Sequence, residues 1–357
     1  MEERFKNILN WKNVLRGSIL FFMFTIIGLL TSSLWKGSKD AVSTLRSIDF
    51  RFLAVMFLLI FVDWVLMGYR VFIFASRMSD RVSFWDCFRA NLANTCIGAI
   101  TPSQTGGWAG QLYILYRSNI TLAGGATITV ITFLFTLLFF LFSALFVIVF
   151  DPQLLKGKMV LLMEYCFVMF GIVLAIFILL LLKPRFALAI LSRFSSSRLF
   201  KFNHHIHRLF QRVMIKLEHL INDYKDYTEL FIKRGKKTLL LGVFITFIIY
   251  FNKLLIAYII ARALDDRTGF WNVIFIQILL TFISYFSPTP GGSGISEISS
   301  TFFMKSIMLQ GTATLFTLIW RFSTTYLELF VGGIIIVAQL RKDIFRNTEP
   351  TENKLDG

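Results

Sequence analysis

Charged and amide side chains occur inside stretches of this sequence that are otherwise apolar. Arg321 and Glu328 lie seven residues apart on one face of a predicted helix, and Lys253 stands beside Asn252 in another apolar run. A charge at the bilayer centre costs at least about 2.5–3.5 kcal/mol, so such groups are expected to face the protein interior and to pair. The residues that we expect to bind a polar substrate are Arg321, Glu297, Glu328, Lys253, Asn252, Gln104 and Gln111.

Arg321 is the residue of this set that we expect to hold an anionic headgroup. A guanidinium group stays charged and binds phosphate through two parallel hydrogen bonds, which Lys cannot reproduce. The alternative is a structural salt bridge, with Glu328 or Glu297 as the partner of Arg321. Asp63, inside another apolar run, is expected to be structural.

Two further apolar stretches, about 84–118 and 270–308, are interrupted by Pro and Gly. Pro donates no backbone hydrogen bond, and Gly adopts conformations that other residues avoid. Such a break frees backbone polar groups, which is tolerated in a membrane only around protein, water or a polar ligand. Kinks that let helices pack closely are the alternative. The predicted break residues are Pro102, Gly106, Gly107, Pro288, Pro290, Gly291, Gly292 and Gly294.

The elements that must position these residues are membrane helices. Of the 357 residues, 56% are hydrophobic and 16% are charged, and the mean hydropathy is +0.68. Soluble domains carry roughly 25% charged residues and lack repeated apolar runs of 18 or more. We therefore predict an all-α polytopic membrane protein. Its six full spans are expected at about 17–35, 52–75, 121–150, 159–182, 238–262 and 313–340.

Basic residues predict the orientation of these spans. The segment 183–237 carries thirteen Lys and Arg against four Asp and Glu, and the tail 341–357 begins with further basic residues. Both are expected to be cytoplasmic, as is the N-terminus. Within 183–237, apolar residues at helical spacing predict a basic amphipathic helix on the inner leaflet or a solvated linker helix. His204, His205 and His207 lack further ligands at metal-binding spacing, so no metal site is predicted.

The two interrupted stretches are related in sequence. Phe84-Trp85 corresponds to Phe270-Trp271 and Pro102 to Pro288 at an offset of 186. The flanking spans also correspond, which predicts one transmembrane domain over 1–340 with repeats at about 52–150 and 238–340. With both termini inside, six spans require that the interrupted stretches form two re-entrant hairpins facing each other, in an inverted repeat. Inverted repeats with paired broken segments are typical of transporters.

The motifs Thr101-Pro-Ser-Gln-Thr-Gly-Gly107 and Ser287-Pro-Thr-Pro-Gly-Gly-Ser-Gly294, followed by Glu297 and Arg321, resemble the lysylphosphatidylglycerol synthase transmembrane region, the flippase-like domain. The resemblance covers about residues 15–340 and implies a lipid flippase. We expect a stand-alone member of the family, without an aminoacyl-transferase domain after residue 340. The first motif departs from the family's pattern, because Gly107 and the neutral Gln111 stand where many relatives carry an acidic residue.

The leading hypothesis for function is a lipid translocase in the cell membrane. It would move an anionic phospholipid, an aminoacylated phospholipid or a polyprenyl-linked lipid between leaflets. One alternative is a lipid-modifying transferase of the lysylphosphatidylglycerol synthase type, for which Glu297, Asp63 or Glu328 would be the general base. Another is an accessory subunit of an envelope-synthesis enzyme. No cofactor and no nucleic acid partner is predicted; the expected partners are anionic membrane lipids, with a homo-oligomer or a lipid-synthesis enzyme as further options.

The basic segments give a testable topology. Single cysteines at Lys39, Lys156 and Asp266 are expected to react with an impermeant maleimide added to intact cells, because they lie in predicted outside loops. Cysteines at Arg208 and Arg346 should react only after the cells are opened. Labelling of Arg208→Cys from outside would reverse the orientation.

Overall fold

A computed structural model describes residues 11–34, 48, 50–102, 104–150, 158–183, 222–264, 268–308 and 310–348. Within these ranges every regular element is a helix, which confirms the predicted all-α membrane class. The greater part of the predicted amphipathic segment, including His204, His205 and His207, lies outside the described residues.

The helices follow the apolar runs. They are α2 (Trp11–Leu34), α4 (Phe50–Ala75), α5 (Phe84–Ala99), α6 (Gly107–Arg117), α7 (Leu122–Phe150), α8 (Lys158–Leu182), η1 (Leu230–Arg234), α12 (Lys236–Ala263), α13 (Phe270–Phe286), α14 (Ile295–Met304), α15 (Gln310–Arg321), η2 (Phe322–Tyr326) and α16 (Leu327–Thr348). Helix is the state in which each segment satisfies its own backbone hydrogen bonds, as lipid requires.

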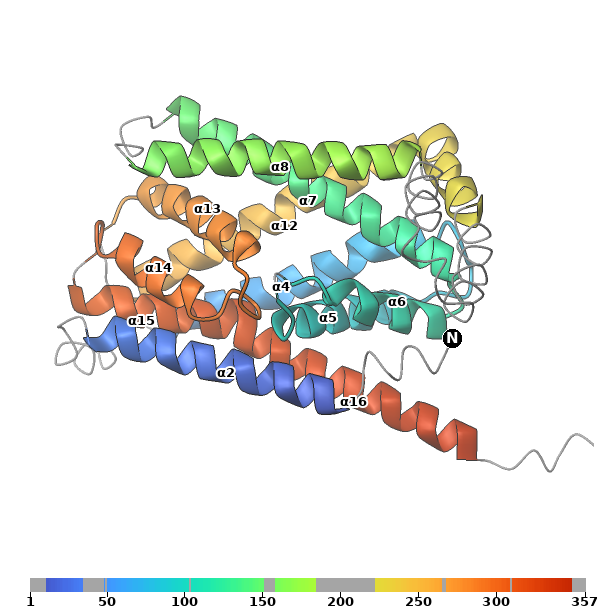
Figure 1. The fold of residues 1–357 in the computed structure, drawn as a ribbon, viewed down its shortest axis with the longest axis horizontal. Coiled ribbons are helices and arrows are strands. Elements are labelled where there is room, and N and C mark those ends of the chain that lie inside the picture. Colours follow the sequence, from blue (N-terminus) through green and yellow to red (C-terminus); the bar gives the residue numbers. More distant parts are fainter. Residues whose placement is uncertain are drawn as a thin grey trace, which may run out of the picture.

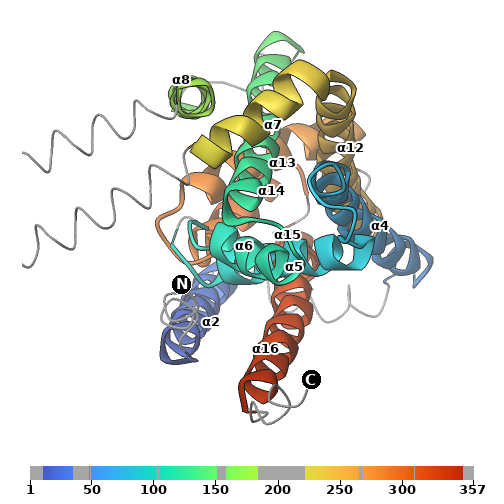
Figure 2. The ribbon, with the colours of Figure 1, turned by 90° about the vertical axis from the view of Figure 1, so that its right-hand side faces the viewer.

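The long helices run roughly along the longest axis of the molecule (Figure 1). In that view α7 and α8 form the upper layer, and α2 and the α15–α16 helix form the lower one. The broken pair α5 and α6 occupies the right half, and the broken pair α13 and α14 occupies the left half. Figure 2, turned by 90°, shows α8 set apart at the edge of the bundle and α7, α13 and α14 nearer its centre. The two broken pairs therefore approach the middle from opposite ends.

Within the described ranges, four helical stretches are long and apolar enough to cross a membrane: Phe50–Ala75, Leu122–Phe150, Lys236–Ala263 and Thr312–Asp343. They match four of the six predicted spans. The other two predicted spans fall on α2 and α8, whose shorter apolar stretches are Arg16–Gly28 and Phe167–Leu179. The number of full spans and the re-entrant course of the broken pairs remain predictions.

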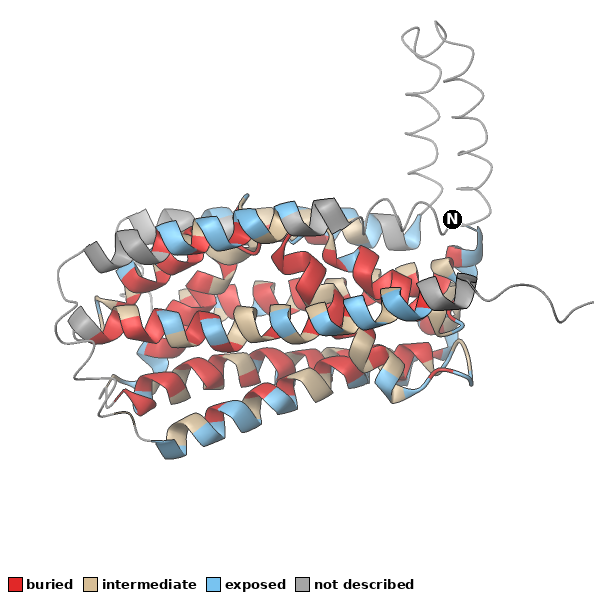
Figure 3. Cartoon of the chain, turned by 90° about the horizontal axis from the view of Figure 1, so that it is seen from below, coloured by how far each residue is buried: buried red, intermediate tan, exposed pale blue. Residues whose placement is uncertain are grey.

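Large apolar side chains face outward from these helices. In Figure 3 the exposed residues lie in stripes along the outer helix faces, and the buried residues lie inside. Examples are Phe22 on α2, Leu145 on α7, Ile172 on α8 and Phe244 on α12, each at least about half exposed. Exposed apolar surface on this scale marks a surface that contacts lipid or another apolar partner.

The last predicted span, 313–340, is interrupted by a π-helical turn. Helix α15 ends at Arg321, the residues Phe322–Tyr326 form η2, and α16 continues from Leu327. A π-bulge inside an α-helix shifts the side chains that follow it and is frequent at functional sites. The apolar run 313–340 predicts one uninterrupted helix, because no Pro or Gly marks the π-turn in the sequence.

Helices α5 and α16 pack through a glycine. A Cβ atom added at Gly332 would lie 2.3 Å from the Leu92 carbonyl oxygen and 2.7 Å from the Cys96 Cβ, so no side chain fits there. The neighbouring Gly333 has only the Cys96 sulfur within 4.0 Å. Small residues that let helix backbones approach closely are a common device of membrane helix packing.

This pair of glycines provides a matched test of the α5–α16 contact. Gly332→Ala is expected to lower the thermal unfolding temperature of the purified protein, because the new methyl group separates the two helices. Gly333→Ala is expected to leave it unchanged or to raise it slightly, since Ala favours helix over Gly by about 1 kcal/mol. Equal effects of the two substitutions would contradict this packing.

Candidate functional site

The two broken segments meet in the middle of the bundle. Pro102 and Pro290 form an isolated antiparallel bridge, and the Gly291 N–H donates to the Thr101 carbonyl oxygen at 3.4 Å. Residues of the two break motifs, far apart in sequence, are thus in direct contact. The predicted arrangement of the two breaks opposite each other agrees with this contact.

The second break depends on glycine. Gly291, Gly292 and Gly294 have φ angles of 56°, 69° and 80°. This left-handed region is strained for residues with a side chain. At the first break the residue with positive φ is Gln104, at 56°, and not one of the predicted glycines. The two breaks therefore differ in their local backbone, although their sequences correspond.

Arg321 and Glu297 form a buried ion pair at the second break. The Arg321 Nε donates to Glu297 Oε1 at 2.7 Å, Nη1 donates to the Thr325 hydroxyl at 3.0 Å, and Nη2 donates to the Gly291 carbonyl at 3.1 Å. Glu297 Oε2 accepts from the Gly294 N–H at 2.6 Å. Of the two partners considered for Arg321, the structure pairs it with Glu297 and not with Glu328.

A second charged group lies nearby, on α4, α12 and α16. The Lys253 Nζ lies 2.8 Å from Asp63 Oδ2 and 3.7 Å from Glu328 Oε1. Lys253 is thus held between two carboxylates from different helices. Asn252, predicted to bind substrate, instead donates from Nδ2 to the Leu59 carbonyl at 2.9 Å, which joins α12 to α4.

A cavity of about 750 Å³ lies between the two halves of the molecule. Its wall includes five of the seven predicted substrate-binding residues, namely Arg321, Lys253, Glu328, Gln104 and Gln111. Glu297 does not reach the wall and is completely buried, so it acts on the cavity through Arg321. The break residue Gly291 also lines the cavity, which places the second break at its edge.

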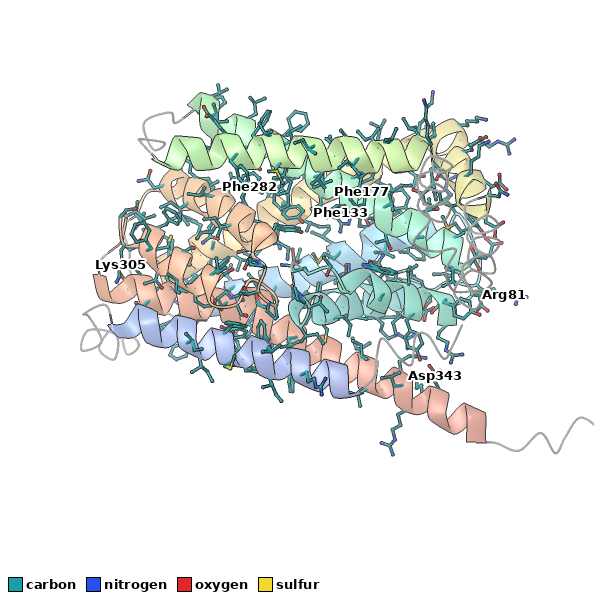
Figure 4. The ribbon with its side chains drawn as sticks, viewed as in Figure 1. Arg81, Phe133, Phe177, Phe282, Lys305 and Asp343 are labelled. Carbon is teal, nitrogen blue, oxygen red and sulfur yellow. The ribbon has the colours of Figure 1, made fainter. Side chains whose placement is uncertain are left out.

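The wall of this cavity combines polar and aromatic side chains. Its charged and amide groups come from α4, α5, α6, α12, α13, the α15–α16 helix and the first break, whereas its phenylalanines come from α7 and α8; α7 also contributes hydroxyl groups. In Figure 4, Phe133 and Phe177 lie next to each other below α8, and their ring centroids are 4.8 Å apart. A cavity with both kinds of lining suits an amphiphilic molecule.

Several polar residues of the wall were not predicted from the sequence. They are Arg70, Asn91, Asn94, Tyr250, Gln277, Ser284 and Tyr285. For Arg70 the signal was present, because it is a charge inside the predicted span 52–75, as Asp63 is. The amides Asn91 and Gln277 stand 186 residues apart, the offset that relates the two predicted repeats.

Residues 15–332 match a protein family described as the lysylphosphatidylglycerol synthase TM region. A UPF0104 membrane protein of Archaeoglobus fulgidus is 22% identical over 318 residues, which cover 87% of this chain and 93% of that protein. A UPF0104 membrane protein of Pyrococcus horikoshii is 20% identical over 342 residues, covering 88% of this chain and 96% of the relative. No solved structure matches the chain.

The ion pair predicts a specific pattern of rescue. Arg321→Gln leaves the Glu297 charge buried without its partner, a change that costs about 3–5 kcal/mol in buried pairs, so we expect a large loss of thermal stability. Arg321→Gln combined with Glu297→Gln should recover most of it, because neither charge then remains. The matched control is Arg321→Gln with Glu328→Gln. Better recovery in the control than in the Glu297 combination would show that the pairing is wrong.

Proposed function

The chain belongs to the lysylphosphatidylglycerol synthase transmembrane region family, and on that premise we propose that it is a lipid translocase. It would move an anionic phospholipid, an aminoacylated phospholipid or a polyprenyl-linked lipid between the leaflets of the cell membrane, with both of its termini in the cytoplasm. The observation that carries this proposal is the cavity between the broken helix pairs, whose lining is both polar and aromatic. Its charged and amide groups suit a headgroup, and its phenylalanines suit the adjoining apolar chain.

The position of the cavity supports translocation. It lies where the two breaks meet, and the broken pairs reach this place from opposite ends of the molecule (Figure 1). In transporters with inverted repeats, a substrate site between the repeats becomes accessible from each side in turn as one repeat moves against the other. A headgroup held here would pass the apolar layer while in contact with polar side chains.

The carboxylates favour transport over group transfer. Among the described residues that line the cavity, the acidic side chain is Glu328, and it lies 3.7 Å from Lys253. Glu297 and Asp63, the other candidates for a general base, are held in shorter ion pairs at 2.7 Å and 2.8 Å. A general base must be free to accept a proton from the reacting group. The paired carboxylates are better suited to a structural role.

We expect the purified protein, reconstituted into liposomes, to move a fluorescent phosphatidylglycerol between leaflets, measured by the fraction of fluorophore that external dithionite reduces. Thr281→Trp should reduce this rate to near that of protein-free liposomes, because Thr281 lines the cavity and the indole would fill it. Leu145→Trp, on the exposed face of α7, is the matched control and should retain transport.

Two results would contradict the proposal. Wild-type protein that is folded but gives no transport with a panel of phosphatidylglycerol, aminoacylated phosphatidylglycerol and polyprenyl phosphate would remove the translocase function. Appearance of a chemically modified lipid in the same liposomes, detected by mass spectrometry after addition of an aminoacyl donor, would favour the transferase instead.

A further inference from the structure

Arg70 is a buried arginine without a carboxylate partner. It lies on α4, and its residue is 8% exposed. Its Nη1 is 3.3 Å from the Thr246 hydroxyl and 3.5 Å from the Thr136 hydroxyl, and its Nε has no hydrogen-bond partner. In the described part of the chain no ion pair includes Arg70, whereas Arg321 has one and Lys253 has two.

Burying the Arg70 guanidinium costs free energy unless a negative charge nearby compensates for its positive charge. A guanidinium group remains charged under all accessible conditions. Two hydroxyl contacts at the long end of the hydrogen-bond range are weak compensation for burying it. Arg70 lines the cavity, so the compensating negative charge can come from the cavity contents.

Two glutamines beside the same cavity are in a similar state. Gln111 on α6 and Gln277 on α13 are each 2% exposed, and the side-chain Nε2 of each has no hydrogen-bond partner. The Gln111 Oε1 accepts from the Asn94 Nδ2 at 3.0 Å. The oxygen of this amide is thus satisfied, whereas its N–H groups are not. Buried donors without a partner are rare and call for an explanation.

The buried side-chain atoms around the cavity that have no hydrogen-bond partner are all of one chemical kind. Among the described residues that line it, the buried side-chain atoms without a partner are the Arg70 Nε, the Gln111 Nε2 and the Gln277 Nε2. All three are N–H donors, and one belongs to a permanent cation. A ligand that satisfies them must offer several acceptor oxygens and a negative charge.

We propose that Arg70, Gln111 and Gln277 line a binding site for a phosphate-containing ligand. Arg70 holds the phosphate group, and the two amides, which come from α6 and α13 in opposite halves of the molecule, donate to other oxygens of the same ligand. Phosphate presents several acceptor oxygens and a negative charge, and guanidinium binds it with strong, charge-assisted hydrogen bonds. The proposal deepens the translocase function and rests on it, since a lipid headgroup is then the source of the phosphate. A free phosphate ester has the same chemistry, and the experiment below separates the two sources.

This site replaces Arg321 as the principal phosphate ligand. Arg321 already donates to Glu297, Thr325 and Gly291, so three of its N–H donors are in use and its charge is neutralised. Arg70 has its charge and its Nε available. From the sequence, both a salt bridge and phosphate binding are options for Arg321. In this proposal Arg321 stabilises the second break through its salt bridge, and Arg70 binds the ligand.

The test measures binding of three probes to the purified full-length chain in detergent. The probes are dioctanoyl phosphatidylglycerol, dioctanoylglycerol, which lacks the phosphate, and glycerol 1-phosphate, which lacks the chains. Arg70→Met should weaken binding of the phosphatidylglycerol by about tenfold or more, as expected for the loss of a hydrogen bond to a charged group. It should leave binding of dioctanoylglycerol unchanged. Gln277→Leu and Gln111→Leu should each weaken phosphatidylglycerol binding by a smaller factor.

The control substitution is Arg81→Met. It removes the same charge from an exposed position in the loop before α5, at the right-hand end of the molecule in Figure 4, and should leave binding of all probes unchanged. Thermal stability without lipid separates a structural role from ligand binding. If Arg70 mainly joins α4 to α7 and α12, Arg70→Met will unfold at a markedly lower temperature. If Arg70 instead binds a ligand, the thermal stability of Arg70→Met without lipid is retained or increased.

Each outcome decides the proposal. Unchanged phosphatidylglycerol binding in Arg70→Met overturns it, as does an equal loss of dioctanoylglycerol binding. If Arg70→Met does not fold, Gln277→Leu decides, since unchanged binding in that variant overturns the site. Binding of phosphatidylglycerol without glycerol 1-phosphate identifies a lipid headgroup, and equal binding of both identifies a free phosphate ester.

The binding experiment and the transport experiment test different claims, so one can fail without the other. Arg70-dependent binding by a protein that moves no lipid would retain the phosphate site and remove the translocase. Transport at the wild-type rate by Arg70→Met would retain the translocase and remove the site.

Discussion

The ion pair between Arg321 and Glu297 makes the second helix break tolerable inside an apolar bundle. A break leaves backbone groups without helical partners, and in lipid each such group costs several kcal/mol. Here Arg321 donates to the carbonyl of Gly291, and Glu297 accepts from the N–H of Gly294. The two charges neutralise each other and satisfy the broken backbone in the same contact. The sharp turn, the short helix α14 and the wall of the cavity all depend on this pair.

The first break is satisfied without charge. The Thr101 hydroxyl donates to the Ile97 carbonyl at 2.9 Å and accepts from the Gly106 N–H at 2.9 Å. A hydroxyl can replace an ion pair here because Gln104 and the turn around it are exposed. The repeats thus share their architecture while differing in electrostatics. This difference leaves the first half of the cavity neutral apart from Arg70.

Charge balance around the cavity gives Arg70 its particular position. Arg70, Lys253 and Arg321 face three carboxylates, Asp63, Glu297 and Glu328, but the carboxylates are distributed unequally. Lys253 lies near two of them, Arg321 has one, and Arg70 has none. A buried guanidinium without an ion pair creates a local positive field within a site whose formal charges sum to zero. Such a site favours a ligand with a concentrated negative charge next to an apolar chain.

The amino-acid composition and the positions of Pro and Gly were enough to determine the class of this protein. Apolar runs of membrane length and few charges exclude a soluble fold, and Pro102, Pro288 and the glycines after them located both breaks. Which charges pair could only be decided by the tertiary structure. Seven-residue spacing places Arg321 and Glu328 on one helix face but does not say that Glu297, on another helix, comes nearer. Arg70, five residues before the end of α4, has the sequence appearance of an interfacial arginine. Only the packing of α4 against α7 and α12 directs it inward, because the partner of a buried charge is set by side chains that are distant in sequence.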